Sequence, residues 1–148
     1  MLTTIEKVIT LQEIDIFQHL STEDLAHIAA IADEVEYPEG VAIFKQGGIA
    51  DSMYMILTGK VLLHQDEREV MVAGEMEAFG TWALFDDEPR VVTATTVEHS
   101  HLLCIDEEDF LDLLSDNVRI TQGVMKSLVT RVRKLAAIRA PGSDAVGR

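Results

Sequence analysis

The chain has 148 residues, a formal net charge of −14 and 47% hydrophobic residues, which is enough apolar content for one folded domain and excludes a disordered chain. The single cysteine, Cys104, lies in an apolar run and excludes a disulfide within the chain. No apolar run reaches the roughly 18 residues of a membrane-spanning helix, and the first residues do not resemble a secretion signal, so we expect a cytoplasmic protein without direct membrane insertion.

The charge is divided unevenly between the two ends of the chain. Residues 1–118 hold five Lys or Arg against 25 Asp or Glu, whereas residues 119–148 hold seven bases and one acid. An acidic body repels the phosphate backbone of nucleic acids, so we expect no nucleic-acid partner. The basic C-terminal part is better suited to packing against the acidic body or against an acidic partner.

Two short helices are predicted at the N-terminus. Thr3 and Glu6 have the spacing of a capping box, in which each side chain bonds the backbone N–H of the other residue. Ser21 precedes Glu23 and Asp24, as is typical of the start of a second helix. The buried face of that helix is predicted from apolar residues at helical spacing: Leu25, Ile28, Ala29, Ile31 and Ala32.

From Asp33 the pattern changes to short β-rich runs that are separated by turn residues. The predicted strands cover residues 35–37, 41–44, 53–57, 61–63, 70–72, 91–97 and 101–105. Gly40, Gly47 and Gly59 fall at the turns, where we expect positive φ or a tight corner. Many short strands at close spacing indicate a small antiparallel barrel or sandwich.

Two further helices are predicted after the strands. Four acids at 106–109 suit the positive end of a helix that ends near Ser115. A longer helix is expected over residues 117–137, with Asn117 as its cap. Its apolar seam, which predicts a homodimer interface or a docking face for another domain, consists of Met125, Leu128, Val132 and Leu135. We expect the domain to cover residues 1–139 and residues 140–148 to form a flexible tail.

The most informative segment is residues 79–94, where Phe79-Gly80 opens a short turn and Pro89-Arg90 closes it. A glycine lets the backbone approach a ligand, and the start of a short helix offers free N–H groups to an anion. Arg90 supplies a planar fork of donors that matches two oxygens. This combination predicts a site for a phosphate or another small anion.

The segment resembles the phosphate-binding cassette of cyclic nucleotide-binding domains, which reads Phe-Gly-Glu-Leu-Ala-Leu, four spacer residues, then Pro-Arg and small residues. The resemblance covers about residues 12–137. It implies a mainly β fold with flanking helices, namely a double-stranded β-helix or jelly-roll-like β-roll followed by a long helix that covers the pocket and forms a dimer. The ligand-binding residues that it implies are Gly80, Thr81, Trp82, Ala83, Arg90, Val91 and Val92.

Two positions depart from the family pattern. Thr81 replaces the Glu that takes the ribose 2′-hydroxyl, and Val91 replaces a small residue beside the phosphate. The acids at 86–88 add repulsion, and one of them could pair with Arg90 and occupy it. The departures predict weak binding of cyclic AMP, cyclic GMP or another small anion. The chain also resembles the variant of this domain that is attached to larger bacterial proteins, in which Gly-Ser or Gly-Thr precedes Trp-Ala-Leu.

No arrangement of residues indicates an enzyme or a metal site. His99 and His101 share one face of a predicted strand and are interpreted as surface imidazoles, because no third ligand is marked by spacing. Two hypotheses remain. The first is a regulatory sensor that signals through its C-terminal helix, and the second is a ligand-free interaction or dimerisation module on the same fold. The chain lacks room for a helix-turn-helix after residue 139, and the sequence leaves open whether it is part of a larger protein.

Overall fold

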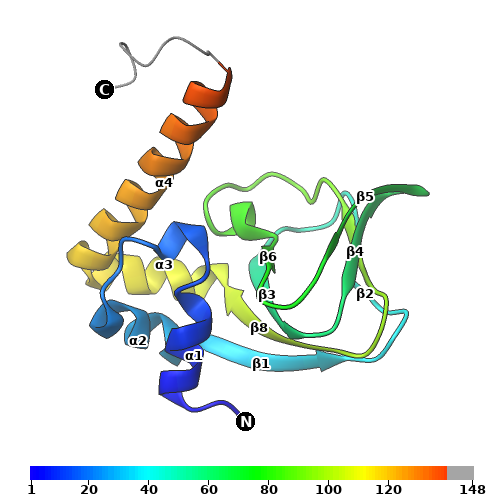
Figure 1. Ribbon diagram of the computed structural model, residues 1–148, viewed down its shortest axis with the longest axis horizontal. Coiled ribbons are helices and arrows are strands. Elements are labelled where there is room, and N and C mark those ends of the chain that lie inside the picture. Colours follow the sequence, from blue (N-terminus) through cyan, green and yellow to red (C-terminus); the bar gives the residue numbers. More distant parts are fainter. Residues whose placement is uncertain (140–148) are drawn as a thin grey trace.

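The N-terminal helices begin where the sequence places their caps. The computed structural model describes residues 1–139, and its first elements are α1 (Thr4–Leu11), the 3-10 turn η1 (Asp15–Phe17) and α2 (Thr22–Ala30) (Figure 1). Thr3 and Ser21 cap α1 and α2, each in a complete capping box, which confirms the predicted starts. The predicted tail, residues 140–148, lies outside the described residues.

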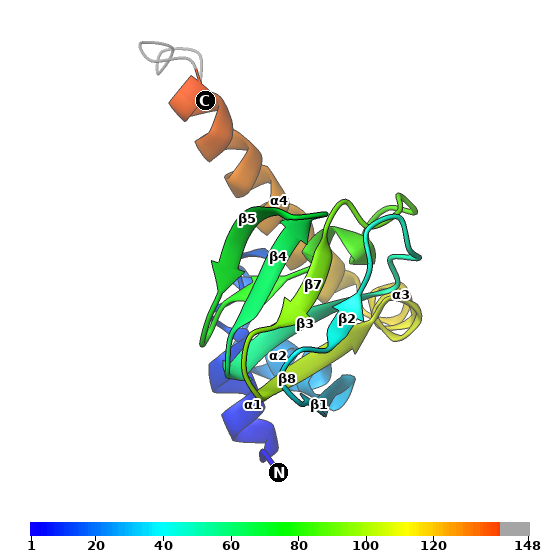
Figure 2. The ribbon, with the colours of Figure 1, turned by 90° about the vertical axis from the view of Figure 1, so that its right-hand side faces the viewer.

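Eight antiparallel strands form two four-stranded sheets, which confirms the mainly β class (Figure 2). One sheet has the order β1-β8-β3-β6 and the other the order β2-β7-β4-β5. The strands are β1 (Ala32–Tyr37), β2 (Ala42–Phe44), β3 (Ser52–Thr58), β4 (Val61–Gln65), β5 (Arg68–Ala73), β6 (Ala78–Phe79), β7 (Thr93–Thr96) and β8 (Ser100–Asp106).

Strand β3 separates two hydrophobic cores. Because successive side chains of a strand point to opposite faces, Met53 and Met55 join the core beneath the helices, while Tyr54 and Ile56 join the core inside the roll. Both faces are therefore buried, which explains why this strand reads as a continuous apolar run rather than an alternating one.

Strand β6 was not predicted, because two residues are too short to carry a periodic pattern. It pairs with β3 in the register Tyr54↔Phe79, and the two rings stack with their centroids 5.4 Å apart. This pairing fixes the start of the segment that the sequence singles out. Gly59 shows why another turn requires glycine: its φ is +110°, and a Cβ there would lie 2.7 Å from the Cα of Ser100.

The chain ends in α3 (Glu107–Asp116) and α4 (Val118–Arg139). Asp106 caps α3 by accepting the N–H of Glu108 at 2.8 Å. Asn117 stands at the predicted start of α4, where its carbonyl accepts the N–H of Thr121 at 3.1 Å, and its side-chain amide also donates to the Leu113 carbonyl of α3 at 2.9 Å. Ile120 and Val124 fasten the first half of α4 to the core, and the second half projects beyond the roll (Figures 1 and 2).

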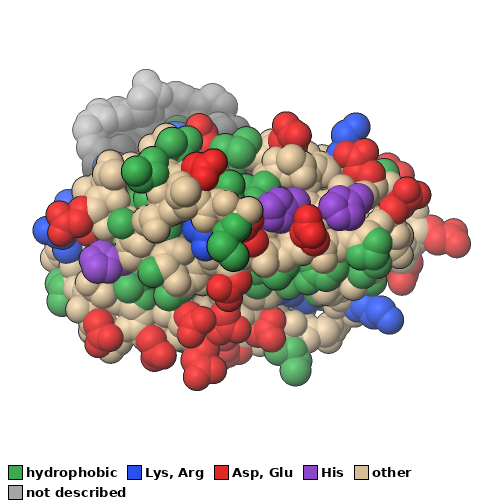
Figure 3. Space-filling view, turned by 90° about the horizontal axis from the view of Figure 1, so that it is seen from below, with side chains coloured by type: hydrophobic (Ala, Val, Ile, Leu, Met, Phe, Trp, Pro, Cys, Tyr) green, Lys and Arg blue, Asp and Glu red, His purple; other side chains and the backbone are tan. Residues whose placement is uncertain are grey.

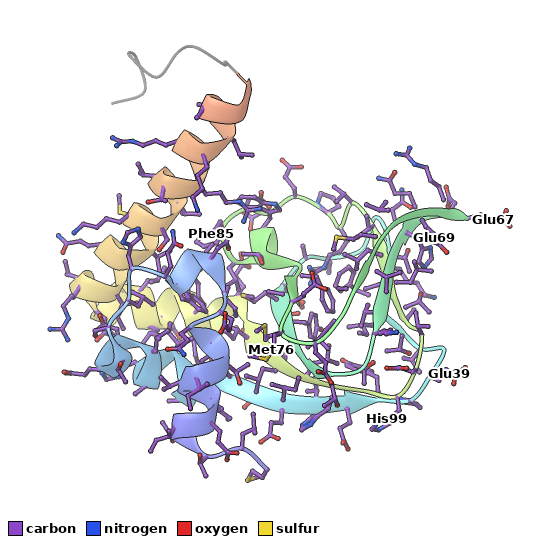
Figure 4. All side chains as sticks on the ribbon, viewed as in Figure 1. Glu39, Glu67, Glu69, Met76, Phe85 and His99 are labelled. Atoms are coloured by element: carbon purple, nitrogen blue, oxygen red, sulfur yellow. The ribbon has the colours of Figure 1, made fainter. Side chains whose placement is uncertain are left out.

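The surface of the body is rich in acids. Figure 3 shows Asp and Glu side chains spread over the lower face of the molecule, with few Lys or Arg among them. Glu67 and Glu69 lie on the β4–β5 hairpin, at the end of the molecule away from α4 (Figure 4). No helix within residues 1–139 is both long enough and apolar enough to cross a bilayer.

Candidate functional site

The cassette runs from β6 through Gly80 and the short turn η2 (Thr81–Leu84) to the loop before β7. Gly80 has a φ of +73°, and a Cβ there would lie 2.7 Å from Nη1 of Arg90. Glycine is therefore required both for the left-handed backbone and for the close approach of the arginine. Phe85, just after η2, packs edge-on against Phe110 of α3 at 5.8 Å and ties the cassette to the helices (Figure 4).

The backbone of Arg90 is fixed by the loop between β2 and β3. Its N–H donates to the Gly48 carbonyl at 2.9 Å, and its carbonyl accepts the N–H of Gly47 at 2.7 Å. These two bonds join segments more than forty residues apart and set the direction in which the arginine side chain leaves the loop. Arg90 is therefore positioned by main-chain contacts that no side-chain pattern reveals.

The side chain of Arg90 points into the protein and is only 7% exposed. Its Nη2 donates to the Ser52 carbonyl at 2.6 Å, and its guanidinium carbon lies 3.8 Å from the centre of the Phe44 ring. Its Nε is buried and has no hydrogen-bond partner among the described residues. Burial lowers the pKa of the guanidinium, an effect that the nearby Tyr54 partly opposes.

The idea that an acid of the 86–88 corner occupies Arg90 is not what the structure shows. These three acids are exposed, and no ion pair within residues 1–139 includes Arg90. Asp86 instead accepts the backbone N–H of Glu88 at 3.2 Å. Within residues 1–139 the buried guanidinium therefore makes no direct ion pair, although Asp51 is near enough to raise its pKa and Asp86 and Glu88 line the same pocket.

Arg90 lies at a pocket of about 310 Å³, which we call the arginine pocket. Its walls are largely apolar, and Ala83 joins Gly80 and Pro89 at its edge. Val91, which is 70% exposed, stands at the rim. The apolar side chains around the arginine include Phe44, Leu63, Trp82, Val91 and Val92.

Thr81 lines a second pocket of about 430 Å³, which we call the threonine pocket. The two pockets share Leu63, Gly80 and Trp82, but Arg90 lines only the first and Thr81 only the second. The resemblance implied a single site for both residues. In the structure the two residues line adjacent pockets that have three residues in common.

Trp82 also connects the cassette to α4. The guanidinium of Arg131 on α4 lies 4.7 Å from the centre of the Trp82 indole, and its Nη1 is 3.2 Å from Oδ2 of Asp15 in η1. Sequence reasoning missed Arg131, Asp15, Phe44 and Ser52 as site residues. Ser52 acts through its backbone carbonyl, and Arg131 is distant in sequence, so neither carries a local signal.

The predicted seam of α4 is divided between two faces. Met125, Val132 and Leu135 are exposed, whereas Leu128 is half-buried against the core beneath the helices. Val129, at 50% exposed, lies on the outer face in its place. A surface on α4 that is free to meet a partner therefore includes Val129 rather than Leu128.

The two histidines and the cysteine considered from the sequence lie in surroundings that, within residues 1–139, do not resemble a metal or catalytic site. His101, which the sequence interpretation treated as a surface imidazole, is half-buried with its Nε2 3.0 Å from Oε1 of Glu34, while His99 is exposed. Cys104 packs against the core of the roll, and burial raises the pKa of its thiol. Within residues 1–139 no three His, Cys, Asp or Glu side chains gather as metal ligands would.

A β-roll with a short cassette turn, a buried arginine and a long C-terminal helix is the fold of sensor and regulatory domains. A sequence profile for the cyclic nucleotide-binding domain matches residues 34–117, more than half of the chain. The chain therefore belongs to the cyclic nucleotide-binding domain family, as its resemblance indicated.

Curated relatives agree with this assignment. The CRP-like cAMP-activated global transcriptional regulator of Mycobacterium tuberculosis is 27% identical and matches 80% of this chain and 55% of its own length. The cyclic AMP receptor protein of Thermus thermophilus is 29% identical and matches 80% of this chain and 57% of its own length. The chain thus spans a little over half the length of these relatives.

A solved structure supports the fold directly. The N-terminal domain of a transcriptional regulator from Streptomyces coelicolor superimposes with a TM-score of 0.79 at 30% identity. The match covers 85% of this chain and 94% of that domain. The β-roll and its helices are therefore shared with a domain that forms part of a transcriptional regulator.

Proposed function

We propose that this domain is a non-catalytic regulatory sensor that binds a cyclic nucleotide or another small anion weakly at Arg90 and signals through α4. The observation that carries the proposal is the buried guanidinium, 7% exposed, with an unpartnered Nε and no direct ion pair among the described residues. A buried charge without a counter-charge is costly, and a bound anion supplies one. The acidic body disfavours nucleic acid as that anion.

Cyclic AMP and cyclic GMP are the first candidates, because relatives of this chain are named for cyclic AMP or cyclic GMP. The Thr81 hydroxyl is a weaker acceptor for a sugar hydroxyl than a carboxylate, and Thr81 lines the neighbouring pocket. Losing such a contact costs about 1–3 kcal/mol, roughly one to two decades in affinity. We therefore expect dissociation constants well above the micromolar range.

Transmission to α4 runs through Trp82. Trp82 lines the arginine pocket and its indole contacts Arg131, so a ligand that shifts Trp82 disturbs the contact with α4. Arg131 and Asp15 are partly exposed, and an exposed pair contributes only about 0–1 kcal/mol. Such a contact is weak enough for a modest binding energy to break.

A ligand-free interaction module on the same fold is the second candidate. It is favoured by the internal partners of Arg90, since the Ser52 carbonyl and the Phe44 ring already hold much of the guanidinium in place. In that case α4 carries the function alone, through a homodimer or a partner protein.

Calorimetric titration with cyclic AMP and cyclic GMP, up to millimolar concentration, separates the two candidates. The sensor predicts saturable binding weaker than micromolar, lost in Arg90→Met, together with a change in the fluorescence of Trp82, which is the single tryptophan of the chain. No binding and no fluorescence change with either nucleotide would exclude both as ligands and favour the ligand-free module. Submicromolar binding would show that Thr81 and Val91 weaken nucleotide binding far less than we expect.

A further inference from the structure

The outer face of α4 is an apolar stripe that nothing in the described residues covers. Along the 22 residues of the helix, positions 118, 122, 125, 129, 132 and 136 recur at alternating steps of four and three and are all exposed. We call these positions the outer stripe; their side chains are Val118, Gln122, Met125, Val129, Val132 and Ala136. The helix is about 33 Å long, and its second half projects from the body (Figure 1).

The opposite face of α4 is already used by the fold. Ile120, Val124 and Ser127 are buried, and Ser127 accepts the backbone N–H of His19. The outer stripe is therefore additional to what holds α4 in place. Alternating steps of four and three are the spacing at which one helix packs along another, with the stripe occupying the a and d positions of a heptad.

A shallow groove of about 550 Å³ runs beside the stripe. Met125 and Val129 contribute apolar surface to it, and Lys126, Arg133 and His19 stand around it. The His19 ring is held by a hydrogen bond of 3.1 Å between its Nε2 and the Thr130 hydroxyl. The groove thus combines an apolar surface with a basic border.

The charge on α4 is of one sign: the helix contains six Lys or Arg and no Asp or Glu. Arg119 pairs with Glu23 and Asp24, and Arg131 pairs with Asp15, so these two are compensated by the body. Lys126 and Arg133 have no ion pair within residues 1–139. Both occupy e positions beside the stripe.

A second copy of α4 does not complement this pattern in either orientation. In a parallel pair the e residues face the partner's g residues, which here are Thr121, Leu128 and Leu135 and carry no acid. In an antiparallel pair Lys126 and Arg133 face their own counterparts, and like charges repel. A homodimer along this stripe therefore leaves its flanking cations without acidic partners on the facing helix.

We propose that the outer stripe of α4 binds an acidic amphipathic helix of a partner protein, with apolar residues against the stripe and Asp or Glu against Lys126 and Arg133. The apolar contact supplies affinity, and the charges select this partner over another copy of the chain. Gln122, the one polar residue of the stripe, fixes the register by requiring a polar residue opposite. This surface is separate from the arginine pocket, so the inference stands whether or not a nucleotide binds.

Two designed peptides test the proposal. Both have four heptads, with Leu at a and d and one Asn to face Gln122, but one carries Glu at every e and g position and the other Lys. Fluorescence anisotropy with the labelled peptides should show the Glu peptide binding at least about tenfold tighter, despite the net charge of −14 on the protein, with affinity falling as salt rises. Lys126→Glu with Arg133→Glu should reverse the preference.

The matched control is Lys45→Glu with Lys60→Glu, which makes the same change in net charge at exposed positions outside α4 and should leave the preference intact. Equal binding of both peptides, or a preference of the unmodified protein for the Lys peptide, overturns the proposal. So does a dimer in sedimentation equilibrium that Val129→Glu dissociates and that the Glu peptide does not compete with, because the stripe then belongs to a second copy.

Discussion

The two halves of the cassette have different surroundings. Arg90, the residue that the family resemblance assigns to phosphate, is buried and fixed by main-chain bonds to Gly47 and Gly48. Thr81, which stands where the resemblance expects a Glu for the sugar, lines the neighbouring pocket, and the exposed Trp82 beside it contacts α4.

We expect from this difference that charge recognition and sugar recognition are separable in this domain. Arg90 stacks on Phe44 and bonds Ser52, so replacing it disturbs the roll as well as the pocket. Thr81 lines a pocket rather than the hydrophobic core, so Thr in place of Glu at this position should have little effect on the stability of the fold. The following experiments, from the largest expected effect to the smallest, test whether the two halves behave as differently as their surroundings indicate.

Removing the charge of Arg90 should have the largest effect. Arg90→Met keeps an apolar side chain but removes every donor, and it should weaken cyclic nucleotide binding by about 3 kcal/mol, roughly 100-fold or more. Calorimetry measures the loss, and a thermal melt confirms that the variant is folded. Arg68→Met, the same change on exposed β5, should bind as the unmodified protein does; equal affinity of all three would place the anion elsewhere.

Restoring the sugar contact should give the next largest effect, in the opposite direction. Thr81→Glu with Val91→Ala returns the carboxylate and removes the branched side chain at the rim, so cyclic AMP should bind about 10- to 100-fold tighter. Thr58→Glu with Val97→Ala makes the same chemical changes at exposed positions outside both pockets and should change nothing. An unchanged affinity in the first variant would mean that Thr81 does not stand where the sugar lies.

Gly80→Ala should couple a loss of stability to a loss of affinity. The variant forces a left-handed backbone on alanine and crowds Nη1 of Arg90, so we expect about 1 kcal/mol lower free energy of unfolding and about tenfold weaker binding. Gly40→Ala is the matched control, since Gly40 has a φ of +80° but open space around its Cβ position. It should lose similar stability and no affinity; parallel losses in both variants would remove Arg90 from the explanation.

The smallest effect should come from the contact between the cassette and α4. Arg131→Gln removes a cation–π contact worth about 0.5–1 kcal/mol and an exposed ion pair worth about 0–1 kcal/mol. We expect altered Trp82 fluorescence and faster amide exchange in the second half of α4. Arg133→Gln, two residues away, should leave both unchanged; if Arg131→Gln also leaves both unchanged, Trp82 does not sense α4.

The sequence predicted the helices and strands that have a periodic apolar pattern or a capping residue. Thr3 and Ser21 located two helix starts because a capping residue acts on its own neighbours. The short strand β6 was missed because its pairing with Tyr54 is a long-range contact without a local pattern. Asn117 was predicted as the start of α4, where its carbonyl accepts the N–H of Thr121, but the bond of its side chain to the Leu113 carbonyl was missed because the same side chain can bond to either helix.

The candidate site was predictable in its residues and not in its geometry. Gly80, Trp82 and Arg90 were named from the resemblance to the family's cassette, and all three line one pocket. Thr81 lines the neighbouring pocket together with Trp82 and Arg131, which contact each other although they are 49 residues apart in sequence. The support of Arg90 by the Ser52 carbonyl is a backbone contact, which residue identity does not encode.

The separation of charge recognition from sugar recognition is tested most directly by comparing cyclic AMP with 2′-deoxy cyclic AMP on the unmodified protein. Both ligands present the same cyclic phosphate to Arg90. They differ only in the 2′-hydroxyl, whose hydrogen bond a carboxylate at position 81 would accept. We predict dissociation constants that agree within about twofold, since removing a hydroxyl that makes no strong hydrogen bond costs little. A preference for cyclic AMP of more than about tenfold would contradict the account, because the protein would then bind the sugar hydroxyl despite the loss of the carboxylate.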